Sequence, residues 1–221
     1  PLMPFSIFSL ASYRNGVLIS TAYFSAIPAM FLLGTLFLQG GLGLEPVFAG
    51  MVTIGFAVAS AWSSWIGGNL VTRLGRPLVV WGILGMVATA GGLVLVALFT
   101  APEWTPWAMA AVMTFGGFAG GLVISPNQTL TLADIPVRSG GVAGSVGQLG
   151  QRIGTAVGTA IALALFYATV YREQDTVDDT VVLYHDAYAS GMITVGVFLG
   201  LALIVGVADL AKRAKTGSQT P

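Results

Sequence analysis

Long stretches without a charged residue alternate with short charged segments along this chain of 221 residues. No Asp, Glu, Lys or Arg occurs in residues 15–44, 46–72, 77–102, 104–133, 153–171 and 187–208. Each run has about the 20 residues that a helix needs to cross a hydrocarbon layer of about 30 Å. The runs are apolar throughout and lack the alternation of membrane strands, which argues against a membrane barrel. The pattern therefore predicts an all-α polytopic membrane protein with six transmembrane helices.

These runs also set the expected boundaries. We expect a six-helix bundle over residues 15–211, with spans at approximately 16–39, 47–71, 78–100, 107–132, 142–170 and 187–208. The fifth helix is expected to start near Gly140, so that it carries Arg152 in its first turns. Because an unpaired arginine at the bilayer centre costs at least about 2.5 kcal/mol, Arg152 either extends to the interface or faces a polar environment.

Composition and the types of side chain narrow the class of protein. The chain is 55% hydrophobic and 8% charged, whereas a soluble domain carries about 25% charged residues, so a soluble domain is excluded. Nine basic and nine acidic side chains cancel, which leaves no charge argument for a nucleic-acid partner. There is no cysteine, and the single histidine, His185, has no second candidate ligand nearby. We therefore expect no metal and no cofactor.

The basic residues of the connections gather on one side of the predicted bundle. With the N-terminus inside, the cytoplasmic side holds Arg14, Arg73, Arg76, Arg138, Lys212, Arg213 and Lys215. Lys and Arg near span ends are retained on the cytoplasmic side. We therefore expect residues 1–14 and the tail 212–221 to be cytoplasmic and residues 172–186 to form an acidic extracytoplasmic loop. This is the arrangement of a multi-pass protein of the plasma (inner) membrane with both termini in the cytoplasm.

The connection between the second and third spans carries the most informative motif. Residues 68–77 read Gly-Asn-Leu-Val-Thr-Arg-Leu-Gly-Arg-Pro. This stretch resembles the major facilitator superfamily signature G-x-L-A-D-R-x-G-R-K, and the matching residues are Gly68, Leu70, Arg73, Gly75 and Arg76. Glycine permits a tight turn here, and the arginines are placed to bond helix carbonyls or a partner carboxylate. Thr72 stands where the signature has its acid and Pro77 where it has its last basic residue.

Further segments are similar to one branch of that superfamily, the fourteen-helix drug:proton antiporters. They are Leu38-Gln39, the residues Gly43-Leu44, Pro46 and Ala49-Gly50, and parts of 126–144 and 150–158. The resemblance implies the C-terminal half of a major facilitator fold, in a carrier that exports amphipathic small molecules against proton flow. The implied partners are the N-terminal transmembrane half of the same carrier, membrane lipid, a small-molecule substrate and protons.

The expected spans contain no Asp or Glu, although a proton-coupled carrier needs a carboxylate in its translocation path. The resemblance therefore places the coupling acid in the N-terminal half. The chain opens on Pro-Leu-Met-Pro without an initiator Met or a secretory signal, and we interpret it as the trailing part of a longer polypeptide. A processed protein would open in the same way.

Three other classes of function stay open at this point. A six-helix protein acting as a homodimer would build the pore from two copies, and a non-transporting scaffold has the same composition. An intramembrane hydrolase would use Ser145 as its nucleophile. That reaction needs a general base, and the only histidine, His185, is expected across the bilayer from Ser145.

In the family's fold, the first helix of each three-helix repeat lines the substrate cavity. The resemblance therefore implies cavity residues on spans 16–39 and 107–132, and the candidates are Phe24, Phe31, Thr35, Gln39, Thr114, Asn127 and Gln128. Aromatic and hydroxyl groups together suit bulky amphipathic compounds. Taken singly, each of the two phenylalanines is better explained by packing on lipid or on neighbouring helices than by a role in the cavity.

The fifth span combines small and polar residues. Gly150, Gly154 and Gly158 form a stripe on one helix face, which permits close contact with a neighbouring helix. The stripe serves either close packing or a surface on which helices rock during transport. Gln148 and Gln151 accompany Arg152 and favour a polar seam over a lipid-facing surface.

Overall fold

A computed structural model describes residues 5–217 of the chain. It consists of helices joined by short connections, with the bounds α1 Ala11–Leu36, α2 Pro46–Met51, α3 Ile54–Leu74, α4 Arg76–Phe99, α5 Thr105–Leu132, α6 Gly140–Glu173 and α7 Thr180–Gly217. Two short 3₁₀ helices lie at η1 Phe5–Ser9 and η3 Val137–Ser139, and a π-helical turn lies at η2 Phe37–Gly41. Residues 1–4 and 218–221, parts of the expected N-terminal segment and C-terminal tail, lie outside the described residues.

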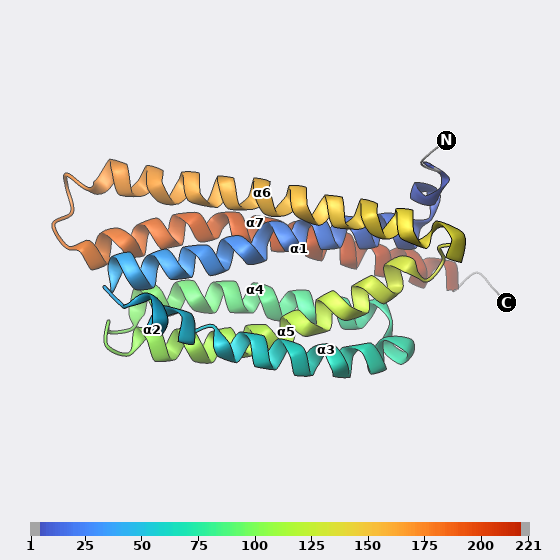
Figure 1. The fold of residues 1–221 in the computed structure, drawn as a ribbon, viewed down its shortest axis with the longest axis horizontal. Helices are drawn as coiled ribbons and strands as arrows, with labels where there is room; N and C mark the ends of the chain where they lie inside the picture. Colours follow the sequence, from blue (N-terminus) through green and yellow to red (C-terminus); the bar gives the residue numbers. More distant parts are fainter. Residues whose placement is uncertain (1–4, 218–221) are drawn as a thin grey trace.

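Within residues 5–217, six helical segments are long and apolar enough to cross a membrane, which confirms the predicted fold class. They are Ala11–Gly41, Pro46–Leu74, Arg76–Phe99, Thr105–Leu132, Val137–Glu173 and Thr180–Arg213. The long helices run lengthwise in one bundle (Figure 1). We call the end with the start of α1 and the α3–α4 turn the terminal end. The end with residues 42–53, 100–104 and 174–179 is the distal end.

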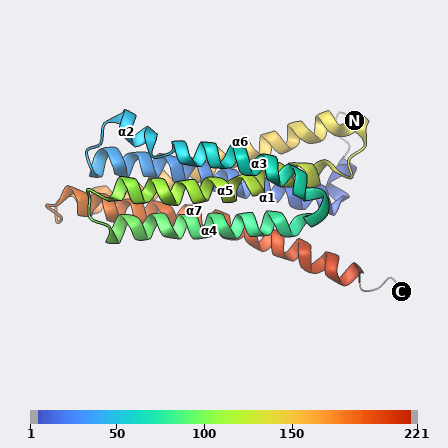
Figure 2. The ribbon, with the colours of Figure 1, turned by 90° about the horizontal axis from the view of Figure 1, so that it is seen from below.

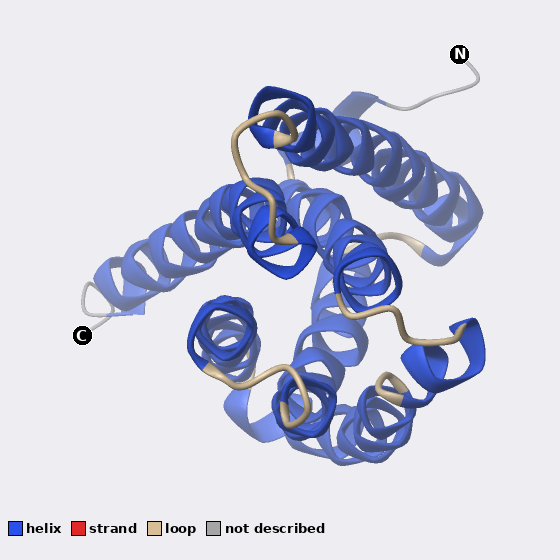
Figure 3. Ribbon diagram, turned by 90° about the vertical axis from the view of Figure 1, so that its left-hand side faces the viewer, coloured by secondary structure: helices blue, strands red, loops and turns tan. Residues whose placement is uncertain are grey.

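The helices pack as two groups of three. In one group α5 contacts both α3 and α4, and in the other α1, α6 and α7 contact one another. Contacts of α1 with α5 and of α4 with α7 join the groups. A view from below the first (Figure 2) and a view along the bundle from the distal end (Figure 3) show the same arrangement. Both groups therefore contribute to one apolar core.

The core contains large side chains in the middle of the bundle and glycines where helices approach closely. Tyr23, Met30 and Met86 are fully buried in the main hydrophobic cluster. A Cβ atom at Gly117 of α5 would collide with the backbone of Phe56 in α3. Packing at such short helix–helix distances is typical of membrane helices, which associate through small residues. Part of the glycine content of the sequence thus reflects close packing between helices.

The structure corrects the expected loop over residues 172–186. Helix α6 extends to Glu173, and α7 already begins at Thr180, so only residues 174–179 connect the two helices. The backbone N–H of Val181 donates a hydrogen bond of 2.8 Å to Oδ1 of Asp179. A carboxylate at this position satisfies an N–H group that the first helical turn leaves without a partner. Of the acidic residues in the expected loop, Asp179 thus caps the start of α7, Asp186 belongs to α7 and Glu173 to α6, while Asp175 and Asp178 lie in the connection.

Candidate functional site

The turn between α3 and α4 is the part of the signature motif that the structure explains most directly. Gly75 has φ +58°, a backbone conformation that favours glycine. Its N–H donates to the carbonyl of Val71 at 2.8 Å and so ends α3. Helix α4 begins at Arg76, with Pro77 in its first turn. The chain therefore reverses direction within a single residue, and the side chain of Arg76 lies at the start of α4.

Arg76 is buried and forms an ion pair with a residue from the last helix. Its Nε lies 2.8 Å from Oδ2 of Asp209 in α7, and 2% of Arg76 and 3% of Asp209 are exposed. Nη1 of Arg76 also donates to Oδ1 of Asn127 in α5 at 2.6 Å. Buried ions of opposite charge are tolerated when they are paired and hydrogen-bonded. The partner carboxylate expected for the arginines thus comes from this chain itself.

Two more side chains complete what we call the terminal network, which comprises Asn15, Arg76, Asn127, Asp209 and Arg213. Nδ2 of Asn15 donates to Oδ1 of Asp209 at 2.7 Å, and Nε of Arg213 lies 3.1 Å from its Oδ2. Nδ2 of Asn127 donates to the carbonyl of Gly16 in α1 at 2.9 Å. The network therefore ties α1, α4, α5 and α7 together at the terminal end.

Sequence reasoning missed Asp209 because it directly follows the uncharged run 187–208. The expectation that no acid lies within the spans changes accordingly, since Asp209 belongs to the segment Thr180–Arg213. Asp209 could have been recognised from its position directly after the apolar run 187–208, at a point where the helix continues. A charged residue at that point needs a partner.

The other matching residues of the motif have different surroundings. Arg73, in the last turn of α3, is exposed and forms no ion pair in the described part of the chain. A Cβ at Gly68 would lie 3.4 Å from Oγ of Ser125 in α5, and Leu70 is half-buried. Of the two arginines, only Arg73 presents its charge at the surface.

A polar seam runs between α1, α5 and α6. Ser20 and Phe24 of α1, Asn127 and Gln128 of α5 and Gln151 of α6 line one small cavity. A neighbouring cavity of about 40 Å³ adds Gln148 of α6 and Thr131 of α5. The structure thus brings together five of the predicted site residues, namely Phe24, Asn127, Gln128, Gln148 and Gln151. We call this group, with Ser20, the polar seam.

Other predicted cavity residues lie apart from this seam. Phe31 and Thr35 line a separate small cavity, nearer the distal end, together with the buried Tyr188 of α7. The ring of Phe31 packs edge-on against that of Phe56, with centroids 4.8 Å apart. Gln39 lies in the wide turn η2 at the distal end of α1 and lines neither cavity. These residues are therefore arranged along α1 and do not form one cluster.

Thr114 faces a different helix. Its hydroxyl donates to the carbonyl of Ala110 in its own helix at 2.8 Å, and a Cβ at Gly55 of α3 would collide with it. Thr114 therefore belongs to the contact between α3 and α5. The spacing of residues along α5 does not by itself show which face of the helix packs on α3 and which packs on α1.

The glycine stripe of α6 packs on α1, as its spacing predicts. A Cβ at Gly150 would lie 2.6 Å from Oγ1 of Thr21, and one at Gly158 would collide with the backbone of Ser25. Gly154 contacts the same stretch of α1. The side chain of Arg152 is exposed beside this stripe and forms no ion pair with any described residue.

The two residues considered for hydrolysis lie at opposite ends of the bundle. The Ser145 hydroxyl donates to the carbonyl of Gly141 at 2.9 Å near the start of α6. His185 stands near the start of α7, at the distal end, with its ring 5.3 Å from that of Phe37. The described residues therefore place no histidine beside Ser145.

Comparison with known proteins identifies the relatives of the chain. It is 26% identical over 146 residues to the methyl viologen resistance protein SmvA of Salmonella typhimurium, which covers 66% of the chain and 29% of SmvA. It is 28% identical over 149 residues to the multidrug resistance protein Stp of Mycobacterium tuberculosis, covering 66% and 26% respectively. A triacylglyceride transporter of Mycolicibacterium smegmatis is 33% identical over 122 residues, covering 49% and 20%. No protein-family model matches the sequence.

These comparisons define the class: the chain is a homologue of membrane transporters and its relatives are not enzymes. More narrowly, two of these relatives are resistance transporters of the major facilitator type, and the six apolar helices among the described residues fit half of that fold. The matched region spans less than a third of the length of each of these relatives.

Proposed function

We propose that the chain forms the C-terminal six-helix half of a secondary active transporter that exports drugs or other amphipathic small molecules by alternating access. The N-terminal transmembrane half of the same carrier supplies the other wall of the substrate path. The carrier lies in the plasma membrane with the terminal end of this bundle in the cytoplasm. Proton entry drives export. This proposal draws on the relatives named for drug resistance and on the short share of their length that the chain matches.

The observation that carries the proposal is the convergence of three helices on the polar seam. Phe24, Gln128 and Gln151 come from α1, α5 and α6 and line one cavity. Side-chain amides beside an aromatic ring offer hydrogen bonds and an apolar surface to the same ligand. A transporter half needs such a wall along its substrate path.

The coupling acid is proposed to lie in the other half. Among the described residues, no Asp or Glu lines the two cavities of the polar seam. Asp209 is held by Arg76, Asn15 and Arg213 at the terminal end, so its oxygens are already engaged. A carboxylate that carries protons must exchange between its partners and water. The surroundings of Asp209 suit a structural role.

The test is dye export by the complete carrier in inverted membrane vesicles with an imposed proton gradient. We expect Gln128→Ala and Gln151→Ala to lower transport of an amphipathic fluorescent dye at least threefold without lowering the amount of inserted protein. Thr114→Val is the matched control, because Thr114 faces α3, and it should transport at the wild-type rate. Wild-type transport by both glutamine variants would contradict the proposed role of the seam.

A second experiment separates the proposed function from its alternatives. The chain alone should insert into membranes and transport nothing, while co-expression with the N-terminal half should restore export. Transport by the chain alone would support the homodimer. Absence of transport by the complete carrier under every dye and gradient tested would favour the scaffold.

A further inference from the structure

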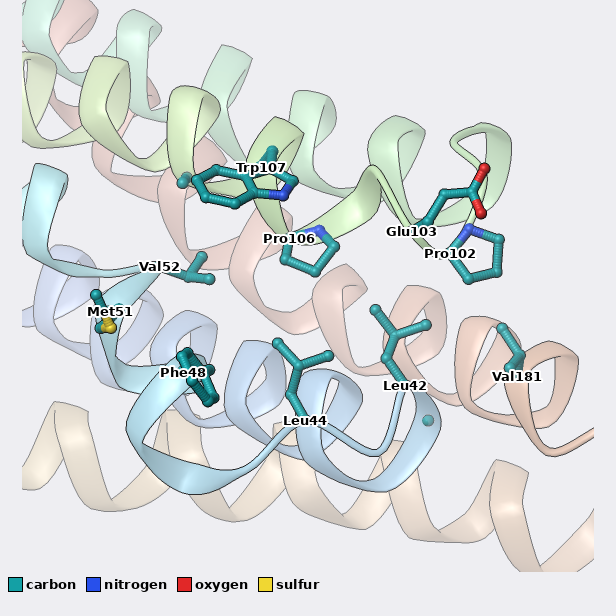
Figure 4. A pocket seen from close by; sticks show the side chains of 12 residues that line it. Leu42, Leu44, Phe48, Met51, Val52, Pro102, Glu103, Pro106, Trp107 and Val181 are labelled. Carbon is teal, nitrogen blue, oxygen red and sulfur yellow. The ribbon is translucent and has the colours of Figure 1, made fainter.

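The described surface has an open apolar part and an open charged part outside the terminal network. The apolar part is a cleft at the distal end, where Phe48 of α2 and Trp107 of α5 lie on opposite walls and Glu103 lies at the rim (Figure 4). The charged part is a face of α6 that carries Arg152, which forms no ion pair with any described residue. Arg152 belongs to a membrane span, whereas Glu103 lies in a connection. A charge within a span needs a partner, so the face of α6 points to something that binds it.

Polar side chains follow this face of α6 at regular spacing. They are Ser145, Gln148, Arg152, Thr155 and Thr159, and steps of three and four residues keep them on one side of the helix. The first three are exposed and the two threonines are half-buried. We call these five residues the α6 polar face. It extends over about 21 Å of the helix, and Arg152 is its centre.

Arg152 lies well inside the bundle. Its neighbours Gly150 and Gly154 both meet Thr21 of α1. Thr21 follows Asn15 of the terminal network by six residues, which is about 9 Å along α1. Arg152 therefore lies deeper in the bundle than the buried ion pair of the terminal network.

The described chain leaves the middle of the α6 polar face uncovered. The glycine stripe of α6 packs on α1, another side contacts α7, and α6 hardly contacts α5. The hydroxyl of Thr155 donates to the carbonyl of Phe24 at 3.1 Å, so α1 borders one edge of the face. Beyond that edge, Gln148 and Arg152 are open to a partner from outside the described residues.

A different side of α6 has the character of a lipid contact. Leu149, Ile153 and Val157 are exposed and apolar. Lipid tails accept such side chains, but they offer no hydrogen bonds to hydroxyl, amide or guanidinium groups. Membrane helices pack closely on small hydroxyl-bearing residues and bond with polar ones. The α6 polar face therefore suits a second protein helix.

The charge of Arg152 defines what this helix carries. A carboxylate neutralises a guanidinium and binds it through two parallel N–H···O bonds. A second copy of this chain fits poorly, because a twofold contact centred on the face would place two Arg152 side chains together. The matched region is less than a third of the length of each relative compared, and the proposed N-terminal half contains further membrane helices.

We propose that the α6 polar face docks a helix of the N-terminal half and that a carboxylate of this helix pairs with Arg152. The inference rests on the proposed function in taking the chain as half of a carrier. Its test reads contact and stability, and neither requires transport. A carrier that exports without this contact would contradict the docking alone, and a carrier that forms the contact without exporting would contradict the export alone.

The contact is tested by photo-crosslinking in the complete carrier, with a protease site inserted ahead of residue 1 to separate the halves afterwards. Benzoylphenylalanine at Gln148, one turn from Arg152, should join the two halves, so that they migrate together after cleavage. The matched control is the same residue at Ile153, which is equally exposed on the apolar side, and it should give several-fold less joined protein. Mass spectrometry then identifies the helix that Gln148 reaches.

Charge reversal tests the ion pair. Arg152→Glu should lower the melting temperature of the complete carrier by at least about 2 °C, and Arg152→Lys should lower it less because it keeps the charge. Arg138→Glu changes an exposed arginine outside the face and should melt like the wild type. Reversing the acid of the crosslinked helix to arginine should restore the melting temperature of Arg152→Glu at least in part.

Three results would overturn the proposal. In the first, Gln148 crosslinks only to lipid, which would assign Arg152 to lipid phosphates, or only to a second copy of the carrier. In the second, the crosslinked helix contains no Asp or Glu. In the third, reversing its acids restores nothing to Arg152→Glu. Because the crosslink is measured with Arg152 intact, it decides the docking even where Arg152→Glu does not fold.

Discussion

Nε of Arg76 lies 2.8 Å from Oδ2 of Asp209, although 133 residues separate the two in the sequence. One residue opens α4 and the other lies near the end of α7, and both are almost completely buried. Through them the signature turn is fastened to the last helix of the bundle. Of the two arginines in this motif, Arg76 therefore holds the start of α4 to the end of α7.

We predict that Arg76→Ala destabilises the chain by about 3–5 kcal/mol, because it leaves the carboxylate of Asp209 buried without its main partner. Thermal unfolding in detergent measures the effect. Arg73→Ala, only three residues away and exposed, should change stability by less than about 0.5 kcal/mol. It should instead lower export by the complete carrier, because its charge is available to a partner.

A double substitution examines the same pair from another side. Replacing both partners with leucine removes the buried charge along with the ion pair, so Arg76→Leu/Asp209→Leu should be more stable than either single variant. If the double variant is as unstable as the sum of the two single variants, the pair is not energetically coupled.

At Gly75 we predict that valine lowers both stability and export while insertion stays intact. The position has φ +58° and no atom lies within 4 Å of a Cβ built there, so the whole cost arises from the backbone. Such strain costs about 1–3 kcal/mol. Gly141→Val, at an open helical position, is the control and should melt like the wild type. Identical melting of all three proteins would show that the turn tolerates side chains.

Bulky substitutions should affect the glycine stripes unequally. Gly158→Val collides with the backbone of Ser25, and we predict a loss of several kcal/mol or failure to fold. Gly196→Val on α7 meets nothing within 4 Å and should be neutral, although its sequence spacing to Gly200 is the same as that of the α6 stripe. Melting temperatures of the two variants in the same detergent compare them directly.

Removing the acid before α7 should loosen the start of that helix. Asp179→Ala loses the bond to the N–H of Val181, and such caps contribute about 0.5–2 kcal/mol. Hydrogen exchange at residues 181–183 should accelerate. Asp178→Ala, which removes the neighbouring exposed carboxylate, should leave exchange unchanged; equal acceleration in both would point to net charge as the cause.

The number and approximate position of the spans could be predicted from the uncharged runs, because hydrocarbon accepts few charges. The ends of the spans could not be predicted from these runs. A helix can contain a charged residue when the fold supplies a partner, as Arg76 does for Asp209, or when the residue caps the helix start, as Asp179 does. The π-helical turn at 37–41 and the short helix α2 also escaped prediction, since a six-residue helix beginning at Pro46 has too short a pattern to recognise.

The candidate site was predictable in type and only partly in arrangement. Gln128 and Gln151 were predicted as site candidates because side-chain amides are rare in apolar helices and need hydrogen-bond partners, and the structure places both on one small cavity. Which helix each residue faces depends on packing between helices, and this is why Thr114 lies against α3 while Asn127 reaches Arg76 and Gly16.

The terminal network also orders the assembly of the protein in time. Asn15 belongs to the first span and Asp209 to the last, 194 residues later. A growing chain therefore holds the guanidinium of Arg76 without its carboxylate until the ribosome has made almost all of α7. A bundle that has only its first five helices therefore contains the guanidinium of Arg76 without its carboxylate, and an unpaired buried charge is costly.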